Sequence, residues 1–457
     1  MTQIDKMIFA IKDVYQSSEK ISKLPEIKIG GWVKSIRESK EIIFITLNDG
    51  SILENLQLKI LQKNFSQDCL LNKINFASYL LVSGELILTP QRKQVFELSV
   101  NQIEIINSVD NNYPLQKNNI PLEVVRNYPH LRAKTNYFLV IFRLRHNISK
   151  AIHDFFHHEN FYYIPTPIIT SSDAEGAGEL FNVITNKKDS FFSKSASLTV
   201  SGQLQAEALA QGLGKVYTFL PCFRAEKSHT TRHLAEFYMI EPEMIFADLD
   251  KITNLAERLV KYVFNYAIAN NIKELEFLEK FNKKELINKL QKILTSDFKK
   301  ISYDESIKIL AKEKNKFIFN DIKWGIDLQS EHEKYLCQYF DNQPVFVTNY
   351  PINLKAFYMK NNSDEKTVAC FDLLLPEIGE LIGGSMREGD YEILREKALK
   401  IGLDTNNLSW YLDLRRYGYA PSGGFGLGLE RLIMFISGTE NIRDTIAFPR
   451  YPKHLDF

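Results

Sequence analysis

The stretch Gly423-Gly424-Phe425-Gly426-Leu427-Gly428-Leu429-Glu430-Arg431, with the earlier Arg224-Ala225-Glu226, determines which fold and which ligand we expect. An Arg and a Glu close together in a strand-like segment offer a phosphate clamp and a hydrogen-bond acceptor. Phe237, at the end of Arg232-His233-Leu234-Ala235-Glu236-Phe237, offers a flat face. The glycines let the backbone approach a ligand closely, and Arg431 can cover the ligand's other face. This combination suits a bent nucleotide triphosphate held between Phe237 and Arg431.

Two other interpretations of the glycine-rich stretch have an observation against them. Its spacing, Gly424-Phe425-Gly426-Leu427-Gly428, differs from the GxGxxG fingerprint of dinucleotide sites, and no βαβ unit surrounds it. A glycine-rich turn that leads into a buried helix from Leu429 to Ile436 would also account for the stretch. Arg431 opposes this second interpretation, because an Arg among apolar residues is costly unless it meets an anion or an aromatic face.

The two stretches resemble motifs 2 and 3 of the class II aminoacyl-tRNA synthetases. The neighbouring Ser201-Gly202-Gln203-Leu204 and Glu241-Pro242-Glu243 are similar to the asparaginyl branch of the subclass that aspartyl, asparaginyl and lysyl enzymes share. The resemblance covers nearly the whole chain from Ile27 onward, apart from one insertion. It implies an α+β fold, with a five-stranded OB-fold barrel at the N-terminus. An antiparallel class II synthetase sheet flanked by helices is implied for the C-terminal domain.

Composition agrees with a globular protein of more than one domain. The chain has 457 residues, of which 44% are hydrophobic and 25% charged, and this length exceeds one ordinary core. Its net charge of +1 means that any contact with nucleic acid must come from local patches. The four cysteines are scattered and form no CxxC pair, which favours a reducing cytoplasm. We expect no signal peptide and no membrane-spanning segment.

Strand patterns and prolines divide the chain. Residues 1–105 contain short alternating segments and the turn Asn48-Asp49-Gly50-Ser51, which predict the barrel and, through the resemblance, an anticodon-binding domain. Residues 106–135 are polar, contain three prolines, and are predicted to be a linker or hinge. Residues 136–457 are the predicted catalytic domain. Within it, the Lys- and Glu-rich range of about 271–335 is predicted to be a helical insertion with a solvated face.

A long helix and a strand open the predicted catalytic domain. From Tyr137, large apolar residues recur at roughly helical spacing, and the segment Phe161 to Ile169, which includes Pro167, follows. This order resembles motif 1, the dimer-forming element of the class II synthetases. The resemblance therefore implies a homodimer through residues of about 138–169.

The resemblance assigns roles around ATP. Arg224 and Arg431 are the implied catalytic residues, with Arg224 between the α-phosphate and the amino-acid carboxylate. Glu226 would contact the adenine amino group. The residues implied to bind ATP are Arg224, Glu226, Arg232, His233, Phe237, Asp372, Glu380 and Arg431. Asp372 and Glu380 also match the family's metal-binding acids, and paired carboxylates near a triphosphate suit Mg²⁺, which prefers oxygen ligands.

The amino-acid pocket decides between the members of the subclass. Glu175 and Gln203 match positions that hold the substrate α-ammonium group. Aspartyl enzymes carry a Lys three residues after the equivalent of Gln203, whereas this chain has Ala206 there. Arg387 matches the Arg that holds the side-chain oxygen, and Glu241 matches an asparaginyl position that accepts from the amide NH₂. An Arg and a Glu together are complementary to a neutral amide, while two cations would suit a carboxylate.

In the predicted barrel, Phe44 and Gln57 match family positions that contact the central anticodon base. A Phe can stack on a base and a Gln can form hydrogen bonds to its edge. Phe44 lies in an apolar strand segment, so an ordinary core position is the alternative interpretation.

The resemblance implies ATP-dependent ligation of L-asparagine to tRNA(Asn) through an asparaginyl-adenylate, with release of AMP and pyrophosphate. An aspartyl-tRNA synthetase of relaxed specificity is one alternative, which Ala206 and Glu241 oppose. A tRNA-independent, adenylate-forming asparagine synthetase is a second, which the predicted barrel opposes. A catalytically silent tRNA-binding relative is a third, and it should have lost at least one of the five residues Arg224, Glu226, Asp372, Glu380 and Arg431.

Overall fold

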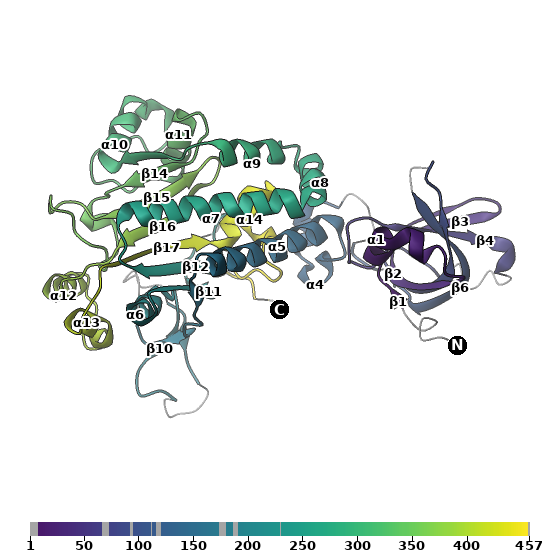
Figure 1. Ribbon diagram of the computed structural model, residues 1–457, viewed down its shortest axis with the longest axis horizontal. Coiled ribbons are helices and arrows are strands. Elements are labelled where there is room, and N and C mark those ends of the chain that lie inside the picture. The colour runs from purple at the N-terminus through teal and green to yellow at the C-terminus, as the bar shows by residue number, and fades with distance from the viewer. Residues whose placement is uncertain are drawn as a thin grey trace. The chain divides into compact units, whose positions relative to one another are not determined.

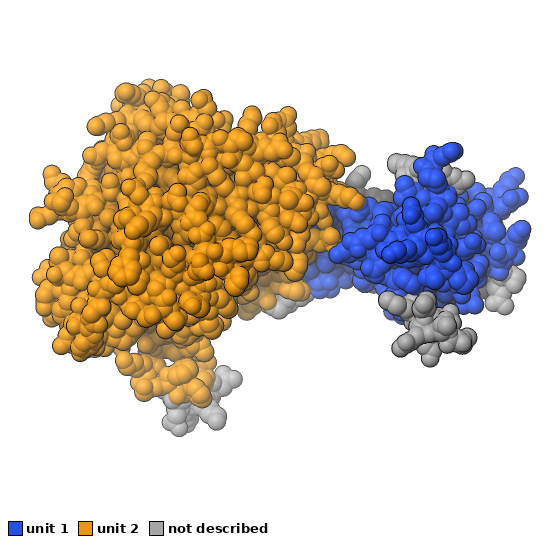
Figure 2. All heavy atoms as spheres, viewed as in Figure 1, with its two compact units in different colours: residues 1–140 blue, residues 141–457 orange. Residues whose placement is uncertain are grey.

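The computed structural model describes residues 8–65, 73–91, 95–110, 112–115, 120–172, 180–185, 191–228 and 230–455. Its chain forms two compact units, residues 1–140 and 141–457, which Figure 2 colours separately. The predicted site residue Glu175 lies outside the described residues.

The first unit contains the predicted five-stranded barrel. Strands β2 to β6 form a ring, because their order β2-β3-β4-β6-β5 is closed by a β2–β5 pairing. This arrangement confirms the OB-fold. The sequence did not predict the strand β1 (Ile8–Phe9), which pairs in parallel with β2, or the helix α1 (Ile11–Ile21). The barrel strands are β2 (Ile27–Glu38), β3 (Ile42–Asn48), β4 (Leu56–Leu61), β5 (Tyr79–Leu88) and β6 (Phe96–Asn107).

Alternation along these strands builds the barrel core. In β4, Leu56, Leu58 and Ile60 are fully buried while the residues between them are partly exposed, as the two-residue period of a strand requires. The predicted turn follows β3, where Asn48 Nδ2 donates to the carbonyls of Ile52 and Glu54. Gly50 has a φ of 82°, a conformation that glycine adopts without strain.

After the barrel, the helices α3 (Leu122–Arg126) and α4 (Pro129–Arg132) lead to the long helix α5 (Asn136–His158). The second unit is built on an eight-stranded sheet of order β13-β14-β15-β16-β17-β12-β11-β7 (Figure 1). Its pairings are antiparallel except β13–β14 and β11–β7, which are parallel. Its strands are β7 (Tyr162–Tyr163), β11 (Lys215–Phe223), β12 (Glu236–Ile245), β13 (Lys299–Ser302), β14 (Val345–Thr348), β15 (Cys370–Leu375), β16 (Gly379–Met386) and β17 (Ser422–Gly428).

Helices flank this sheet, as the resemblance implies. The helix α7 packs on β16 and β17, and α6 packs on β11 and β12 (Figure 1). The side chain of Asp248 caps α7 by accepting from Lys251 N at 2.7 Å, and Gly438, with a φ of 69°, ends α14. These helices are α6 (Gln203–Leu213), α7 (Leu249–Asn270), α12 (Tyr391–Lys400), α13 (Ser409–Arg416) and α14 (Leu429–Ser437). A separate small sheet contains β8 (Ile169–Thr170), β9 (Asn182–Val183) and β10 (Ala196–Leu198).

The range 271–335 is mainly helical but also contributes a strand to the large sheet. Its strand β13 pairs with β14. The sequence of β13, Lys-Lys-Ile-Ser, carries no apolar alternation, because this strand lies at the edge of the sheet. The helices in this range are α8 (Ile272–Asn282), α9 (Leu286–Thr295), α10 (Tyr303–Lys312) and α11 (Ser330–Tyr339).

Among the described residues, none of the helices is both long enough and apolar enough to cross a membrane.

Candidate active site

Strand register places acidic residues and glycines in rows across one face of the large sheet. In one row, Glu243 of β12 pairs with Gly424 of β17, which pairs with Ser385 of β16. In the next row, Asp372 of β15 pairs with Gly383, and Gly383 pairs with Gly426. Because glycines carry no side chain, those of β16 and β17 leave space above the sheet between the acids of β12 and the acid of β15.

The close approach of strands explains the glycines of β17. A Cβ on Gly424 would lie 2.1 Å from the carbonyl oxygen of Pro242 and 2.5 Å from Glu243 Oε1. A Cβ on Gly426 would lie 2.7 Å from Met239 Cε. The glycine-rich stretch therefore forms the floor of a site in a central strand, and α14, which carries Arg431, begins directly after it.

Seven of the eight residues predicted to bind ATP line one cavity of about 150 Å³. Arg224 lies over the ring of Phe237, with its guanidinium carbon 5.3 Å from the ring centroid. His233 Nε2 lies 4.0 Å from Glu226 Oε2. The seven residues are Arg224, Glu226, Arg232, His233, Phe237, Glu380 and Arg431.

Three arginines line this cavity, together with three glutamates. Burial and the neighbouring charge of Arg431 lower the pKa of Arg232, and both side chains line the cavity. Burial and the charges of Arg431, Arg232 and Arg224 also lower the pKa of His233, against the opposing charge of Glu226. The guanidinium groups can bind the oxygens of a polyanion such as a triphosphate, and the carboxylates beside them can bind its counter-cation.

Arg431 is held by Glu380. Its Nη1 donates to the Glu380 carbonyl at 3.1 Å and lies 3.3 Å from Glu380 Oε2. Burial alone would raise the pKa of Glu380, but the charges of Arg431, Lys355 and Arg224 lower it below its ordinary value. Glu380 is therefore ionised at neutral pH and can bind a cation.

Asp372 and Glu380, the predicted metal ligands, converge above Gly383. A Cβ on Gly383 would lie 3.0 Å from Glu380 Oε1 and 3.5 Å from Asp372 Oδ1. Two residues that the sequence did not single out complete this group. Lys355 Nζ donates to both oxygens of Asp372, at 2.6 and 2.8 Å, and Glu333 Oε2 of α11 accepts from Glu380 N at 3.1 Å. The described residues hold no group of three metal-ligating side chains, so the carboxylates of Asp372 and Glu380 suit Mg²⁺ in combination with the oxygens of a bound triphosphate.

On the other side of the glycine floor, Glu241 is fixed by the start of α6. Its carboxylate accepts from Ser201 Oγ and, at 2.8 Å, from Gly202 N. Gln203 follows, and its Nε2 is buried and has no hydrogen-bond partner within the described part of the chain. A buried donor of this kind needs an acceptor, which a bound ligand can supply.

Arg387, at the end of β16, is paired with Glu243. Its Nε donates to Glu243 Oε2 at 3.1 Å, its Nη2 to Oε1, and its Nη1 to Ser385 Oγ. Burial alone would lower the pKa of Arg387, but the charge and hydrogen bonds of Glu243 raise it above its ordinary value. No role is predicted for Glu243 from the sequence, although the two-residue period of a strand places it on the same face as Glu241.

The matching family is described as tRNA synthetases class II (D, K and N), over residues 121–452, and residues 27–106 match an OB-fold nucleic acid binding domain. An asparagine--tRNA ligase from Alkaliphilus oremlandii is 46% identical over 98% of this chain and 99% of its own length. One from Mycoplasma mycoides is 49% identical over 94% and 96%. The crystal structure of asparaginyl-tRNA synthetase from Pyrococcus horikoshii, complexed with asparaginyl-adenylate, matches with a TM-score of 0.88 and 31% identity over 98% and 99%.

This chain belongs to the asparaginyl branch of the class II aminoacyl-tRNA synthetases. Membership of this branch confirms the resemblance and the enzyme class predicted from the sequence. An aspartyl-tRNA synthetase from Entamoeba histolytica has the same fold at 21% identity, with a TM-score of 0.78.

The barrel of this synthetase carries the two predicted anticodon-binding residues on one surface. Phe44 pairs with Lys59 across β3 and β4, and Thr46 pairs with Gln57. All four residues are partly exposed. Gln57 Nε2 donates to Glu97 Oε2 at 3.4 Å, so the buried Glu97 orients it. Phe44 is therefore accessible at the surface of the barrel, and its role in anticodon binding stays a prediction.

Proposed function

We propose that this chain ligates L-asparagine to tRNA(Asn) in two steps, of which the first consumes ATP. In the first, the asparagine carboxylate attacks the α-phosphorus of ATP, which gives asparaginyl-adenylate and pyrophosphate. In the second, the terminal ribose hydroxyl of the tRNA attacks the adenylate carbonyl carbon, and AMP leaves. The observation that carries the proposal is that the cavity lined by the three arginines and the Glu241–Arg387 side lie on one face of one sheet, with the glycines of β17 between them.

Catalysis in this proposal comes from positioning and charge rather than from a nucleophilic side chain. Arg224 holds the α-phosphate and the attacking carboxylate together, and Phe237 and Arg431 hold the adenine between them. The donor set at Asp372 and Glu380 would hold Mg²⁺, which when bound supplies charge neutralisation for the triphosphate. Lys355 and Arg431 keep those two carboxylates in place.

Asparagine is recognised by complementary polarity in this proposal. The guanidinium of Arg387 donates to the side-chain carbonyl oxygen, and Glu241 accepts from the NH₂ group. Gln203, whose Nε2 lacks a partner among the described residues, contacts the amino-acid backbone. Glu175 completes the α-ammonium site as an expectation from the resemblance alone.

The proposal includes a homodimer formed through residues of about 138–169. The short edge strand β7 and the segment after it expose large side chains: Tyr162 is 60% exposed, Tyr163 49% and Ile169 45%. An exposed edge strand with apolar neighbours needs a covering surface, which a second copy supplies.

The proposal also divides the chain into three parts. Residues 1–105 bind the anticodon, residues 106–135 are a linker, and residues 136–457 carry out catalysis. The proposed location of the protein is the cytoplasm.

Pyrophosphate exchange with asparagine and aspartate compared side by side tests the function. We expect ATP–pyrophosphate exchange that depends on asparagine, and tRNA charging that depends on the tRNA(Asn) anticodon. Equal exchange with aspartate would favour the aspartyl alternative, and amide synthesis without tRNA would favour the asparagine synthetase.

A further inference from the structure

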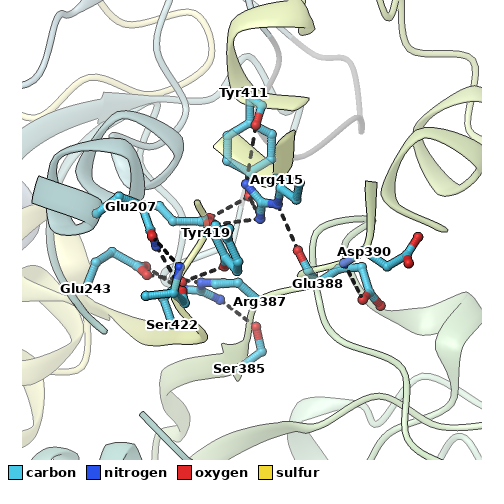
Figure 3. Close-up of polar contacts among 12 residues, drawn as sticks. Glu207, Glu243, Ser385, Arg387, Glu388, Asp390, Tyr411, Arg415, Tyr419 and Ser422 are labelled. Atoms are coloured by element: carbon cyan, nitrogen blue, oxygen red, sulfur yellow. Dashed lines mark hydrogen bonds and ion pairs between the residues drawn. The ribbon is translucent and has the colours of Figure 1, made fainter. Parts of the chain in front are cut away.

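A buried polar cluster outside the predicted site residues lies behind the amino-acid side of the site (Figure 3). At its centre, Glu207 of α6 accepts three hydrogen bonds. Arg415 Nη2 donates to Oε1 at 2.6 Å, Tyr419 OH to Oε1 at 3.0 Å, and Tyr411 OH to Oε2 at 2.5 Å. The side chains of Glu207 and Arg415 are both fully buried.

The pair connects two elements that carry predicted substrate contacts. Glu207 lies one helical turn after Gln203 on α6, so the position of one fixes the position of the other. Arg415 of α13 also donates from Nε to the carbonyl of Glu388 at 2.8 Å, and Glu388 directly follows Arg387. Arg415 therefore bridges the helix of Gln203 and the backbone of Arg387.

A second route joins the same two elements. Tyr419 OH contacts Ser422 Oγ at 2.7 Å, and the Ser422 carbonyl accepts from Arg387 N at 2.9 Å. Both routes start at the Glu207 carboxylate and end at the backbone around Arg387. Figure 3 shows the two buried ion pairs, Glu207–Arg415 and Glu243–Arg387, in neighbouring positions.

Carboxylates outnumber guanidinium groups in this region before a substrate binds. Arg387 is neutralised by Glu243 and Arg415 by Glu207, and the buried Glu241 adds a further carboxylate. Neither guanidinium is available as an uncompensated cation for a substrate carboxylate. A neutral amide substrate does not need an uncompensated cation, since hydrogen bonds alone can bind it.

Burial of the Glu207–Arg415 ion pair costs desolvation free energy, which an apolar contact in the same place would avoid. Burying two charges is repaid only by good geometry, and apolar side chains of similar volume often serve stability equally well. An Arg, however, donates in several fixed directions at once, so it can hold a carboxylate and a carbonyl in one arrangement.

We propose that Glu207 and Arg415 are positioning residues that set the spacing between Gln203 and Arg387 and thereby the affinity for the amino acid. The inference deepens the proposed function and rests on it for the identity of the amino acid. Neither residue touches the substrate in this proposal, and both act through the two residues that do.

Three variants test the proposal in the full-length chain. Glu207→Gln keeps the shape and removes the charge. Arg415→Lys keeps the charge but cannot reach Glu207 and the Glu388 carbonyl together. A double variant, Glu207→Leu with Arg415→Met, replaces the ion pair with an apolar pair and guards against misfolding caused by a single buried charge. The matched control is Glu274→Gln, which breaks the Arg143–Glu274 pair (2.9 Å) between α5 and α8.

The measurements are the KM values for asparagine and for ATP in pyrophosphate exchange, the dissociation constant of L-asparagine by calorimetry, and the melting temperature. We expect each of the three variants to raise the asparagine KM and dissociation constant by about tenfold or more, because small misplacements at a binding site are costly. The ATP KM should stay within about twofold. The control should lower only the melting temperature.

Unchanged asparagine binding in Glu207→Gln or in the folded double variant would overturn the proposal, as would equal rises of both KM values. Failure of the proposed function gives a different result. If the wild type activates only aspartate, asparagine is the wrong substrate, and the positioning role is then judged from the dissociation constant of aspartate in the same variants.

Discussion

At the scale of single residues, the proposed choice of substrate rests on Glu241, whose two carboxylate oxygens are fixed by Ser201 and Gly202. A fixed carboxylate about 4 Å from the substrate side chain would repel aspartate by about 4 kcal/mol at an effective dielectric of about 20. This corresponds to about a thousandfold preference for asparagine. Glu241→Gln removes the charge and keeps the size of the side chain. It also keeps both contacts, because the new amide can accept from Gly202 N and donate to Ser201 Oγ.

We expect Glu241→Gln to raise the activation of aspartate relative to asparagine. The measurement is the ratio of the two kcat/KM values in pyrophosphate exchange, for the variant and the wild type. Glu274→Gln, a buried carboxylate on α8, is the control and should leave the ratio unchanged. An unaltered ratio in Glu241→Gln would remove Glu241 from amide recognition.

Arg224 is the residue whose removal should slow adenylate formation. Its guanidinium lies over Phe237 in the cavity lined by the three arginines, where it would bind charge that develops in the transition state. Losing such a contact costs about 3 kcal/mol or more, so Arg224→Ala should slow asparagine-dependent pyrophosphate exchange by about a hundredfold or more. Circular dichroism provides the folding control. Near-normal exchange by the folded variant would exclude Arg224 from the mechanism.

The sequence predicted the residue types of this site better than their partners. Arg224, Phe237 and Arg431 were placed around one ligand because motifs give local order, and the structure brings them into one cavity. The partners Lys355 and Glu243 were not predicted, because each meets a residue that is distant in the sequence. Strand register brings Glu243 to Arg387, and a loop after a short helix brings Lys355 to Asp372, and no local pattern reports either contact.

At the scale of elements, the pairing of β12 with β17 determines how closely the acids approach the glycine floor. A Cβ on Gly424 would meet the backbone oxygen of Pro242 at 2.1 Å, so the two strands would have to separate. A Cβ on Gly428 would meet nothing within 4 Å. Gly428→Ala is therefore a control for Gly424→Ala, since both replace a glycine of the same strand.

Gly424→Ala should lower the free energy of unfolding by about 1–3 kcal/mol, as overpacking does, and weaken asparagine binding because Glu243 and Arg387 move. Gly428→Ala should leave the unfolding free energy within about 0.5 kcal/mol of the wild type. Chemical denaturation and asparagine titration measure the two effects. Equal stability of both variants would mean that the β12–β17 spacing adjusts without cost.

Prediction of elements succeeded where a pattern was long and failed where the chain was short or at an edge. The barrel strands were found because their apolar residues alternate over many positions, as in β4. The strand β1 has only two residues, and β13 has a polar sequence, so neither carries a detectable period. Both are ordered by pairing with a neighbouring strand, which is tertiary information.

At the scale of the whole molecule, the two units divide the proposed work. Every described residue predicted to contact ATP or asparagine belongs to residues 141–457, whereas Phe44 and Gln57 belong to residues 1–140. If the barrel binds the anticodon, changes there should affect steps that involve tRNA and leave adenylate formation alone. The division gives a test in which each unit is the control of the other.

Phe44→Ala should weaken tRNA charging through tRNA affinity, because the loss of a base-stacking ring costs about 1–3 kcal/mol, or about five- to 150-fold. Phe44 is partly exposed and pairs with Lys59, so the truncation opens no cavity in the barrel core and the fold should persist. Asparagine-dependent pyrophosphate exchange should keep its wild-type rate. Arg224→Ala should give the converse result, with tRNA affinity retained and exchange lost. If Phe44→Ala binds tRNA(Asn) as the wild type does, Phe44 is no more than a structural residue of the barrel, and the anticodon must be recognised by other side chains on that surface.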